Sequence, residues 1–116
     1  MNDTSRLLSS DIVFWGERVA AHTEGLTEQQ FLNDDLAADV VCWCLRCIGE
    51  AAGALYRSNA TLRSFDPALD LVKAYGMRNR LAHDYGGIDL GVVWQAATVS
   101  VPAMVLAARQ VIQRGT

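Results

Sequence analysis

Apolar residues recur at intervals of three and four positions along almost the whole chain, which is the spacing of an amphipathic helix. Residues 34–57 show this pattern most clearly, because their apolar positions fall on one face of a helix. That face would carry Val40, Val41, Cys44, Leu45, Ile48, Ala51, Ala52 and Leu55. No segment alternates between apolar and polar positions over the length of a strand. The pattern therefore predicts an all-α fold.

Residues that favour helix ends divide the chain into four main helices and a short one. Ser, Thr and Asp side chains accept hydrogen bonds in the first turn of a helix, and glycine often ends one. The predicted helices run from Ser10 or Asp11 to about Gly25, from Thr27 to Asn33, from Asp34 or Asp35 to about Arg57, from Asp66 and Pro67 to Gly86 and Gly87, and from Leu90, behind a cap at Asp89, to Arg114. Residues 58–65 form the main connector. We expect one helical bundle in a single domain, residues 1–116.

Three local signals carry most of the information about these ends. Thr27 and Gln30 form a capping-box pattern. Asp66 before Pro67 predicts a helix start, since the carboxylate caps the first turn and proline suits its first position. Pro102 lies inside the last helix and is expected to kink it, because proline cannot donate the helical hydrogen bond. The residues of the fourth helix expected to face the core are Leu69, Val72 and Tyr75.

The three tryptophans and His22 are expected to be structural. Trp15 and His22 follow the helical spacing of Ile12 and Val19, so they should lie in the core or at its edge. The same expectation applies to the other two tryptophans, Trp43 and Trp94. Residues 49–53, GEAAG, are small enough to let two helices approach closely, but Glu50 among them requires a partner or solvent.

Composition narrows the class of protein. Hydrophobic residues make up 51% and charged residues 20% of the chain, which fits a well-filled interior and argues against disorder. The net charge of −3 excludes a uniformly basic nucleic-acid-binding surface. The charges are uneven, however: residues 1–40 contain eight acids and two arginines, whereas residues 41–116 contain eight bases and five acids. The later part can therefore carry a mildly basic site.

The N-terminal residues and the three cysteines indicate where the protein is located and whether it binds metal. The N-terminus lacks the basic start and apolar run of a signal peptide, and no apolar stretch reaches the roughly 20 residues of a membrane span. We therefore expect a cytoplasmic protein without membrane contact. Cys42 and Cys44 would point about 200° apart on a helix and could not share a metal. With Cys47, they are expected to be small buried thiols, and we predict neither a metal site nor a cofactor.

The segment RNRLAHDY, residues 78–85, concentrates hydrogen-bonding and ionisable groups at the end of the fourth helix. On a regular helix Arg78 and Tyr85 lie within about 20° of each other, whereas His83 lies about 140° from Arg78. One helix therefore cannot aim Arg78 and His83 at the same atom. Either the helix loosens before Gly86, or a second copy of the chain completes the cleft. Asn79 precedes His83 by four positions and could orient its imidazole.

These residue types favour chemistry on anionic oxygen. Arginine presents a fixed fork of donors that matches phosphate, and histidine transfers protons near neutral pH. The pair fits RNA cleavage by a 2′-hydroxyl, with His83 moving the proton and Arg78 stabilising the charge on phosphate. Arg80 is a further candidate for contact with RNA. A structural interpretation stays open, because cations at a helix C-terminus are favourable through the macrodipole alone and Tyr85 could simply pack.

Together these residues resemble the motif of the HEPN superfamily, and within it the HepT-like toxins of toxin–antitoxin pairs. The HepT-like motif is an arginine, a polar residue, a histidine five positions after the arginine and a tyrosine two positions further on, and Arg78, Asn79, His83 and Tyr85 match it. The segments IGEAAG and DYGGIDLGVVW also resemble those proteins. The usual P.IPW sequence before the motif is replaced here by FDPALDLVKAYGMRN.

The resemblance implies a HEPN-like bundle that acts as a homodimer and cleaves RNA without metal. Arg78 and His83 would be catalytic, Asn79 would assist, and Tyr85 would line the cleft. The resemblance also implies a type VII-like system in which a minimal nucleotidyltransferase antitoxin neutralises the toxin by transferring AMP to Tyr85. The alternative is a non-catalytic helical module that pairs with a nucleotidyltransferase and uses Arg78 and Arg80 as anion contacts.

Overall fold

The computed structural model describes residues 3–114, and every regular element within that range is helical. The α-helices are α1 (Asp3–Thr23), α2 (Glu28–Leu32), α3 (Asp35–Ser58), α4 (Leu71–His83), α5 (Leu90–Gln95) and α6 (Val101–Arg114). Short 3-10 turns cover Ala60–Ser64 and Tyr85–Gly87, and a π-helical turn, Ala96–Ser100, joins α5 to α6. Because α5, the π turn and α6 form one continuous helix, the prediction of four main helices and a short one is confirmed.

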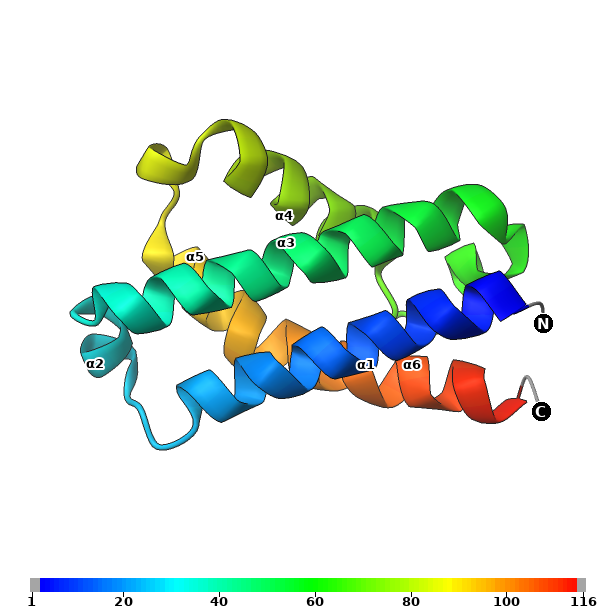
Figure 1. Ribbon diagram of the computed structural model, residues 1–116, viewed down its shortest axis with the longest axis horizontal. Coiled ribbons are helices and arrows are strands. Elements are labelled where there is room, and N and C mark those ends of the chain that lie inside the picture. The colour runs from blue at the N-terminus through cyan, green and yellow to red at the C-terminus, as the bar shows by residue number, and fades with distance from the viewer. Residues whose placement is uncertain (1–2, 115–116) are drawn as a thin grey trace.

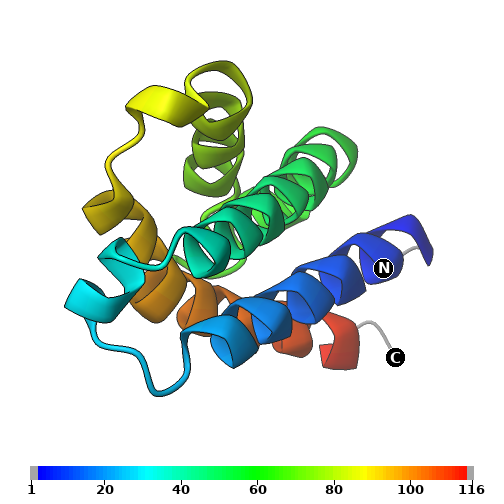
Figure 2. The ribbon, with the colours of Figure 1, turned by 60° about the vertical axis from the view of Figure 1, so that its left-hand side comes forward.

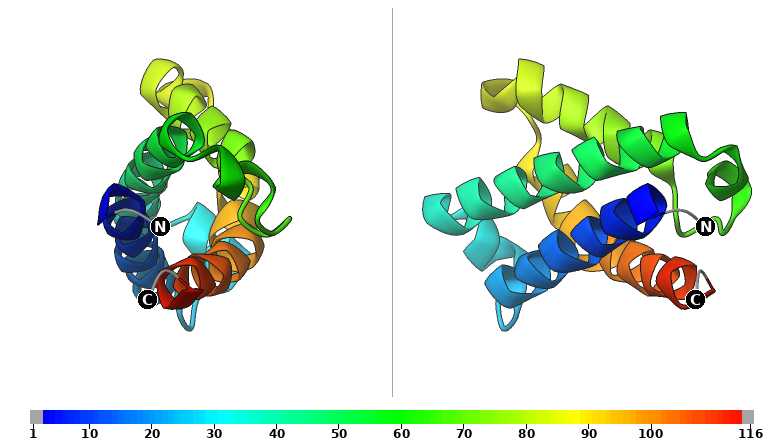
Figure 3. Two further views of the ribbon diagram at one scale, coloured as in Figure 1. Left: turned by 90° about the vertical axis from the view of Figure 1, so that its right-hand side faces the viewer. Right: turned by 45° about the vertical axis from the view of Figure 1, so that its right-hand side comes forward.

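The main helices run up and down, and α3 occupies the middle of the arrangement. Figure 1 shows α1 antiparallel to α3, and α3 antiparallel to α4, with both ends of the chain at the same end of the bundle. Helix α3 packs against α1 on one flank and against α4 on the other, while α1 also packs against α6. Figures 2 and 3 show α4 on the outside of the bundle, resting on α3. The motif helix is therefore attached to the body mainly through α3.

Helix α1 begins earlier than the sequence predicts, at Asp3 instead of Ser10 or Asp11. Its buried face continues through small polar positions, because Ser9 and Ser5 are fully buried one and two turns before Ile12. The Ser5 hydroxyl accepts a hydrogen bond of 3.0 Å from the Asn59 amide, which ties the start of α1 to the end of α3. Apolar periodicity could not reveal this extension, since serines occupy the core-facing positions.

The predicted caps are confirmed at three helices. Thr27 and Gln30 form the capping box of α2, Asp34 accepts a hydrogen bond from the backbone N–H of Ala37 in α3, and Asp89 accepts one from Gly91 in α5. Local cap chemistry therefore determines where these helices begin.

The predicted start of α4 at Asp66 and Pro67 is wrong. The Asp66 carboxylate caps only a tight turn, in which it accepts a 2.8 Å hydrogen bond from the N–H of Ala68. Helix α4 begins at Leu71, and Asp70 caps it by accepting a hydrogen bond from the backbone of Lys73. The turn places Leu69 in the core before the helix starts. Burial of this leucine therefore decides between two acidic residues that could each cap a helix.

The predicted orientation of α4 is only partly correct. Leu69 is buried and Tyr75 is half-buried, but Val72 is 63% exposed. Val72 lies about 100° around the helix from Leu71, which is the residue that α4 buries in its first turn. Because α4 rests chiefly on α3, only one narrow face of it is covered.

The last helix interrupts its regular hydrogen bonding just before Pro102. The N–H of Val101 donates to the carbonyl of Ala96, five residues back, so the π turn widens the helix at the point where proline cannot donate. Leu90–Arg114 is long and apolar enough to cross a membrane, contrary to the sequence expectation. However, one face of it fills the core, with Val93, Ala97, Val101, Met104, Val105, Ala107, Ala108 and Val111 buried. Part of its apolar surface thus lies in the core, whereas Val99 and Leu106 remain exposed.

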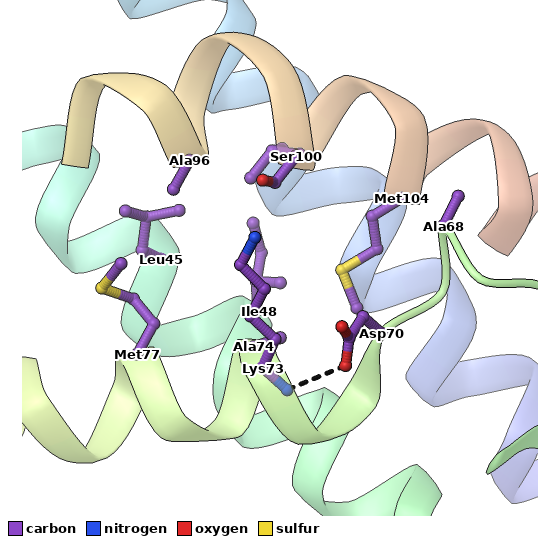
Figure 4. Close-up of a pocket in the computed structure, with 11 residues that line it drawn as sticks. Leu45, Ile48, Ala68, Asp70, Lys73, Ala74, Met77, Ala96, Ser100 and Met104 are labelled. Carbon is purple, nitrogen blue, oxygen red and sulfur yellow. Dashed lines mark hydrogen bonds between the residues drawn. The ribbon is translucent and has the colours of Figure 1, made fainter. Parts of the chain in front are cut away.

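A small cavity of about 60 Å³ lies between α3, α4 and the last helix. Figure 4 shows its lining, in which Met77 and Lys73 come from α4, Leu45 from α3, and Met104 from α6. No residue of the 78–85 segment lines it. This cavity therefore lies between α4 and α6 and is separate from the motif site.

Candidate active site

The motif helix stays regular through His83 and loosens only afterwards. Helix α4 ends at His83, the N–H of Asp84 donates to the carbonyl of Arg80, and Gly86 and Gly87 lie in the following 3-10 turn. Helix α4 thus ends at His83, three positions before the predicted end at Gly86 and Gly87. Because the helix is regular up to His83, Arg78 and His83 point in different directions within one copy of the chain. The second arrangement considered from the sequence, a cleft completed by a second copy, stays a prediction.

Arg78 is held against α3 by a carboxylate. Its Nε donates to Glu50 in an ion pair, and its Nη1 donates to Asn79 Oδ1 at 2.9 Å. The guanidinium carbon also lies 5.8 Å from the centre of the Tyr75 ring. Only part of the donor fork is used by these contacts, so the remainder can meet a phosphate. Glu50 thus has a partner, which resolves the choice that the sequence left open between a partner and solvent.

The two helices approach closely where α3 carries glycine. A β-carbon at Gly49 would lie 2.3 Å from the β-carbon of Arg78 and 2.7 Å from the carbonyl oxygen of Ala74. A β-carbon at Gly53 would collide with the Tyr75 ring, at 2.4 Å. The prediction that GEAAG allows close approach of two helices is confirmed. This approach brings the base of the Arg78 side chain next to Glu50.

Tyr85 is held at the opposite end of α3. Its hydroxyl donates a hydrogen bond to the carboxylate of Asp39, although the residue is 46% exposed. This bond is the main cause that raises the pKa of Tyr85 to about 12, since an ionised phenolate would face a carboxylate. Tyr85 is therefore protonated at neutral pH and has a proton acceptor in contact with it.

The two anchoring carboxylates follow a simple geometric rule that sequence analysis missed. Asp39 and Glu50 are eleven positions apart, about three turns, so they lie on the same face of α3. Arg78 on α4 and Tyr85 in the 3-10 turn that follows it are seven positions apart, and both side chains face α3. Because the helices are antiparallel, each carboxylate meets one residue of the motif. The eleven-residue spacing that puts Asp39 and Glu50 on one face of α3 is the sequence signal from which these pairings could have been predicted.

The other motif residues lie on the free side of α4. His83 and Arg80 are exposed, and Asn79 is half-buried. The Asn79 oxygen accepts a hydrogen bond from Arg78, and among the described residues no hydrogen bond joins Asn79 to His83 as the sequence had suggested. The structure thus divides the motif: Arg78 and Tyr85 face α3, whereas His83 faces solvent.

Between the two anchors, α3 and α4 enclose a groove of about 380 Å³. Its lining residues are Asp39, Cys42, Trp43, Arg46, Leu81, Ala82 and Tyr85. Trp43 was expected to belong to the core or its edge, but it is 56% exposed and lies in this groove. Trp15 and Trp94 are partly buried against the core, as expected.

The cysteines and His22 lie outside the motif. Cys42 and Cys44 are buried and Cys47 is half-buried, which confirms small, mostly buried thiols. Burial raises the pKa of all three, in the case of Cys42 to about 11. His22 is exposed, with its Nδ1 2.9 Å from the carbonyl oxygen of Arg18, so its predicted place near the core is wrong. Within residues 3–114 no cluster of His, Cys, Asp or Glu has a metal-binding arrangement.

Comparison with known proteins gives a consistent assignment. The family model described as "Ribonuclease HepT-like" matches residues 16–111, which include the whole motif. Two proteins of Methanocaldococcus jannaschii, "Putative RNase MJ0125" and "Putative RNase MJ1216", are each 28% identical over 92 residues, covering 79% of this chain and 77% and 74% of theirs. "Putative RNase TTE0752" of Caldanaerobacter subterraneus is 22% identical over 98 residues, covering 84% of this chain and 85% of its own. No solved structure matches the chain.

Proposed function

Since the chain belongs to the HepT-like ribonuclease family, we propose that it is a metal-independent RNA endonuclease, the toxin of a cytoplasmic type VII-like toxin–antitoxin pair. The observation that carries this proposal is the anchored Arg78, whose free donors lie on the same helix as an exposed His83. A fixed guanidinium is suited to stabilise charge that develops on phosphate. An exposed imidazole is suited to exchange protons with substrate.

In the proposed reaction, a 2′-oxygen of RNA attacks the adjacent phosphorus. The bond from phosphorus to the 5′-oxygen breaks, which leaves a 2′,3′-cyclic phosphate and a 5′-hydroxyl end. His83 takes the proton of the 2′-hydroxyl, and a protonated imidazole of the dimer supplies one to the leaving oxygen. Arg78 stabilises the added charge on phosphate, and Asn79 holds the guanidinium through its side-chain oxygen. Arg80, exposed two positions after Arg78, contacts the RNA backbone.

A homodimer would bring the two halves of the motif together. The free side of α4 carries Val72, Gly76, Asn79 and His83 at helical spacing. Val72 is exposed although it is apolar, and a β-carbon at Gly76 would meet nothing within 4 Å, so a second helix could approach here. In such a dimer the His83 of one copy can face the Arg78 of the other, which one copy alone does not allow.

Neutralisation by AMP transfer fits the surroundings of Tyr85. In that step, the Tyr85 oxygen attacks the α-phosphorus of ATP bound to a minimal nucleotidyltransferase, and pyrophosphate leaves. The phenol needs a proton acceptor because its pKa is about 12, and the Asp39 carboxylate is already hydrogen-bonded to it. The attached phosphate adds negative charge and bulk in the groove that Arg46 also lines, which would exclude RNA.

The test is cleavage of transfer RNA and messenger RNA by purified, unmodified protein in EDTA. We expect the unaltered protein to cleave and to leave 2′,3′-cyclic phosphate ends, while Arg78→Ala and His83→Ala lose cleavage and remain folded. His22→Ala is the matched control, since His22 is the chain's second histidine and is also exposed, on α1. Cleavage by folded His83→Ala at the wild-type rate would exclude the proposed proton transfer.

A separate experiment tests whether the antitoxin transfers AMP to Tyr85. Tyr85→Phe should remain dimeric and active but should not accept AMP when incubated with ATP and a minimal nucleotidyltransferase that modifies the wild-type chain. AMP on another residue of that variant at the wild-type level would remove Tyr85 from the acceptor role. Absence of any cleavage by a folded, AMP-free dimer would favour the non-catalytic partner module, in which Arg78 and Arg80 serve as anion contacts.

A further inference from the structure

Trp43 is exposed in a way that packing within the chain does not explain. Its side chain is 56% exposed in the middle of α3, while the neighbouring turns of that helix bury Val41, Leu45 and Ile48. A large apolar side chain at the surface indicates a binding site when it lies in a hollow together with charged groups. Trp43 meets this description, because it lines the groove between α3 and the end of α4.

The groove combines aromatic surface with a cation. The Arg46 guanidinium carbon lies 5.6 Å from the centre of the Trp43 ring, one turn further along α3. Tyr85 lines the same groove from the turn after α4, and Leu81 and Ala82 form its apolar floor from α4. Aromatic side chains beside arginine are the elements with which proteins bind single-stranded nucleic acid, because every base can stack on a ring.

The groove is continuous with the motif. Asp39, Trp43, Arg46 and Glu50 follow one another at intervals of four, three and four positions, so they form one stripe along α3. The Asp39–Tyr85 hydrogen bond closes one end of this stripe, and the Glu50–Arg78 ion pair marks the other. Along this stripe Arg46 lies between Trp43 and the Glu50–Arg78 ion pair. Its positive charge is therefore at the end of the groove nearer to Arg78.

We propose that this groove is a nucleotide subsite for the RNA strand, in which a base stacks on Trp43 and its phosphate contacts Arg46, while the neighbouring phosphate reaches Arg78. The inference rests on the proposed ribonuclease function and adds the surface that holds the strand beside the site of cleavage. The carboxylate of Asp39 does not oppose it, because Asp39 lies at the far end and is bound to the Tyr85 hydroxyl. Trp43 and Arg46 act in binding and specificity and do not touch the reacting atoms.

The test measures binding separately from cleavage. The probe is a short, dye-labelled single-stranded RNA in which every 2′-hydroxyl is methylated, so that it cannot be cleaved by internal attack. Fluorescence anisotropy gives its affinity for the wild-type protein, for Trp43→Leu and for Arg46→Gln. Phe14→Leu is the matched aromatic control, since Phe14 is 53% exposed on α1. Arg63→Gln is the matched charge control. Arg63 lies beyond the end of α3, and its guanidinium carbon is 4.3 Å from the centre of the Tyr56 ring.

We expect Trp43→Leu to weaken binding by roughly five- to 150-fold, which corresponds to the loss of one stacked base. Arg46→Gln should weaken binding and reduce its salt dependence, whereas both controls should bind as the wild type does. Equal affinity of all variants would overturn the subsite. Loss of binding together with conversion of Trp43→Leu to monomers in sedimentation would also overturn it, because Trp43 would then be a subunit contact. Failure of the ribonuclease proposal itself is seen separately, as absence of cleavage of ordinary RNA by the wild type.

Discussion

The β-carbon of Arg78 lies directly over Gly49, so that even a methyl group on this glycine would come within 2.3 Å of it. The backbone of α3 and the first carbon of the motif arginine are thus in the closest contact that their atoms allow. This contact places the guanidinium beside Glu50. The position of Arg78 therefore depends on the absence of a side chain at Gly49 of the neighbouring helix.

Gly49→Ala should destabilise the fold and impair cleavage. The added methyl group would force α4 away from α3, and overpacking of this kind costs about 1–3 kcal/mol. Gly86→Ala is the control, since nothing lies within 4 Å of its would-be β-carbon and its φ is not positive. It lies in the 3-10 turn after α4, outside the proposed dimer face, and alanine there should stabilise the fold by roughly 0.4–1 kcal/mol. Urea denaturation of both variants tests this. A Gly49→Ala protein as stable and active as the wild type would show that the helices can separate freely.

Glu50→Gln should lower the rate of RNA cleavage much more than it lowers stability. The Glu50 side chain is 57% exposed and the Arg78 side chain 27%, so loss of this partly exposed pair should change the free energy of unfolding by about 1 kcal/mol or less. The guanidinium would lose its fixed position, and misplacement of such a group can reduce the rate by on the order of 100-fold. A positioning role predicts that kcat falls while KM changes little. Glu17→Gln, which breaks the exposed Glu17–Arg109 pair, should leave both constants unchanged.

The Tyr85 phenol should titrate near pH 12, and Asp39→Asn should bring its pKa back toward the ordinary value near 10. The hydrogen bond favours the protonated form, so it stabilises the folded chain below pH 10 and this contribution is lost as the pH rises to about 12. Ultraviolet titration of phenolate formation in the wild type, in Asp39→Asn and in Tyr85→Phe isolates this residue. Identical titration curves for the wild type and Asp39→Asn would exclude the contact.

The thiols should react slowly in the native protein. Burial, with a smaller contribution from nearby Asp39, raises the pKa of Cys42 to about 11, so little of it is thiolate at pH 8. Cys47, which is half-buried, should be alkylated by iodoacetamide first, and the rate at Cys42 should rise as the pH approaches 11. Mass spectrometry of the labelled native chain tests the order. In guanidinium chloride all three thiols should react alike, and fast native labelling of Cys42 at pH 8 would contradict its burial.

The sequence predicts those parts of the fold that depend on neighbouring residues. Thr27, Asp34 and Asp89 cap helices where expected, because a cap needs only the next three residues. The start of α4 could not be predicted in the same way, since Asp66 and Asp70 both satisfy the local rule and only the burial of Leu69 separates them. Information of that kind exists only in the packed structure.

The site was predictable to the same extent. The motif residues are adjacent in the chain and could be identified together, as could the conflict between the directions of Arg78 and His83. Their partners could not, because the pairings with Glu50 and Asp39 join residues 28 and 46 positions apart. The exposure of Trp43 was missed for a related reason: helical spacing shows which residues share a face, but not which face remains uncovered.

Because α4 is attached to the body mainly through α3, the spacing of Asp39 and Glu50 along α3 sets where Arg78 and Tyr85 are held. Inserting a single residue into α3 between Asp39 and Glu50 would turn one carboxylate by about 100° relative to the other. The two anchors could then no longer engage Arg78 and Tyr85 at once. The loops around α4 can change in length without this effect, so the distance between the two anchors depends on one stretch of helix and not on the connections around it.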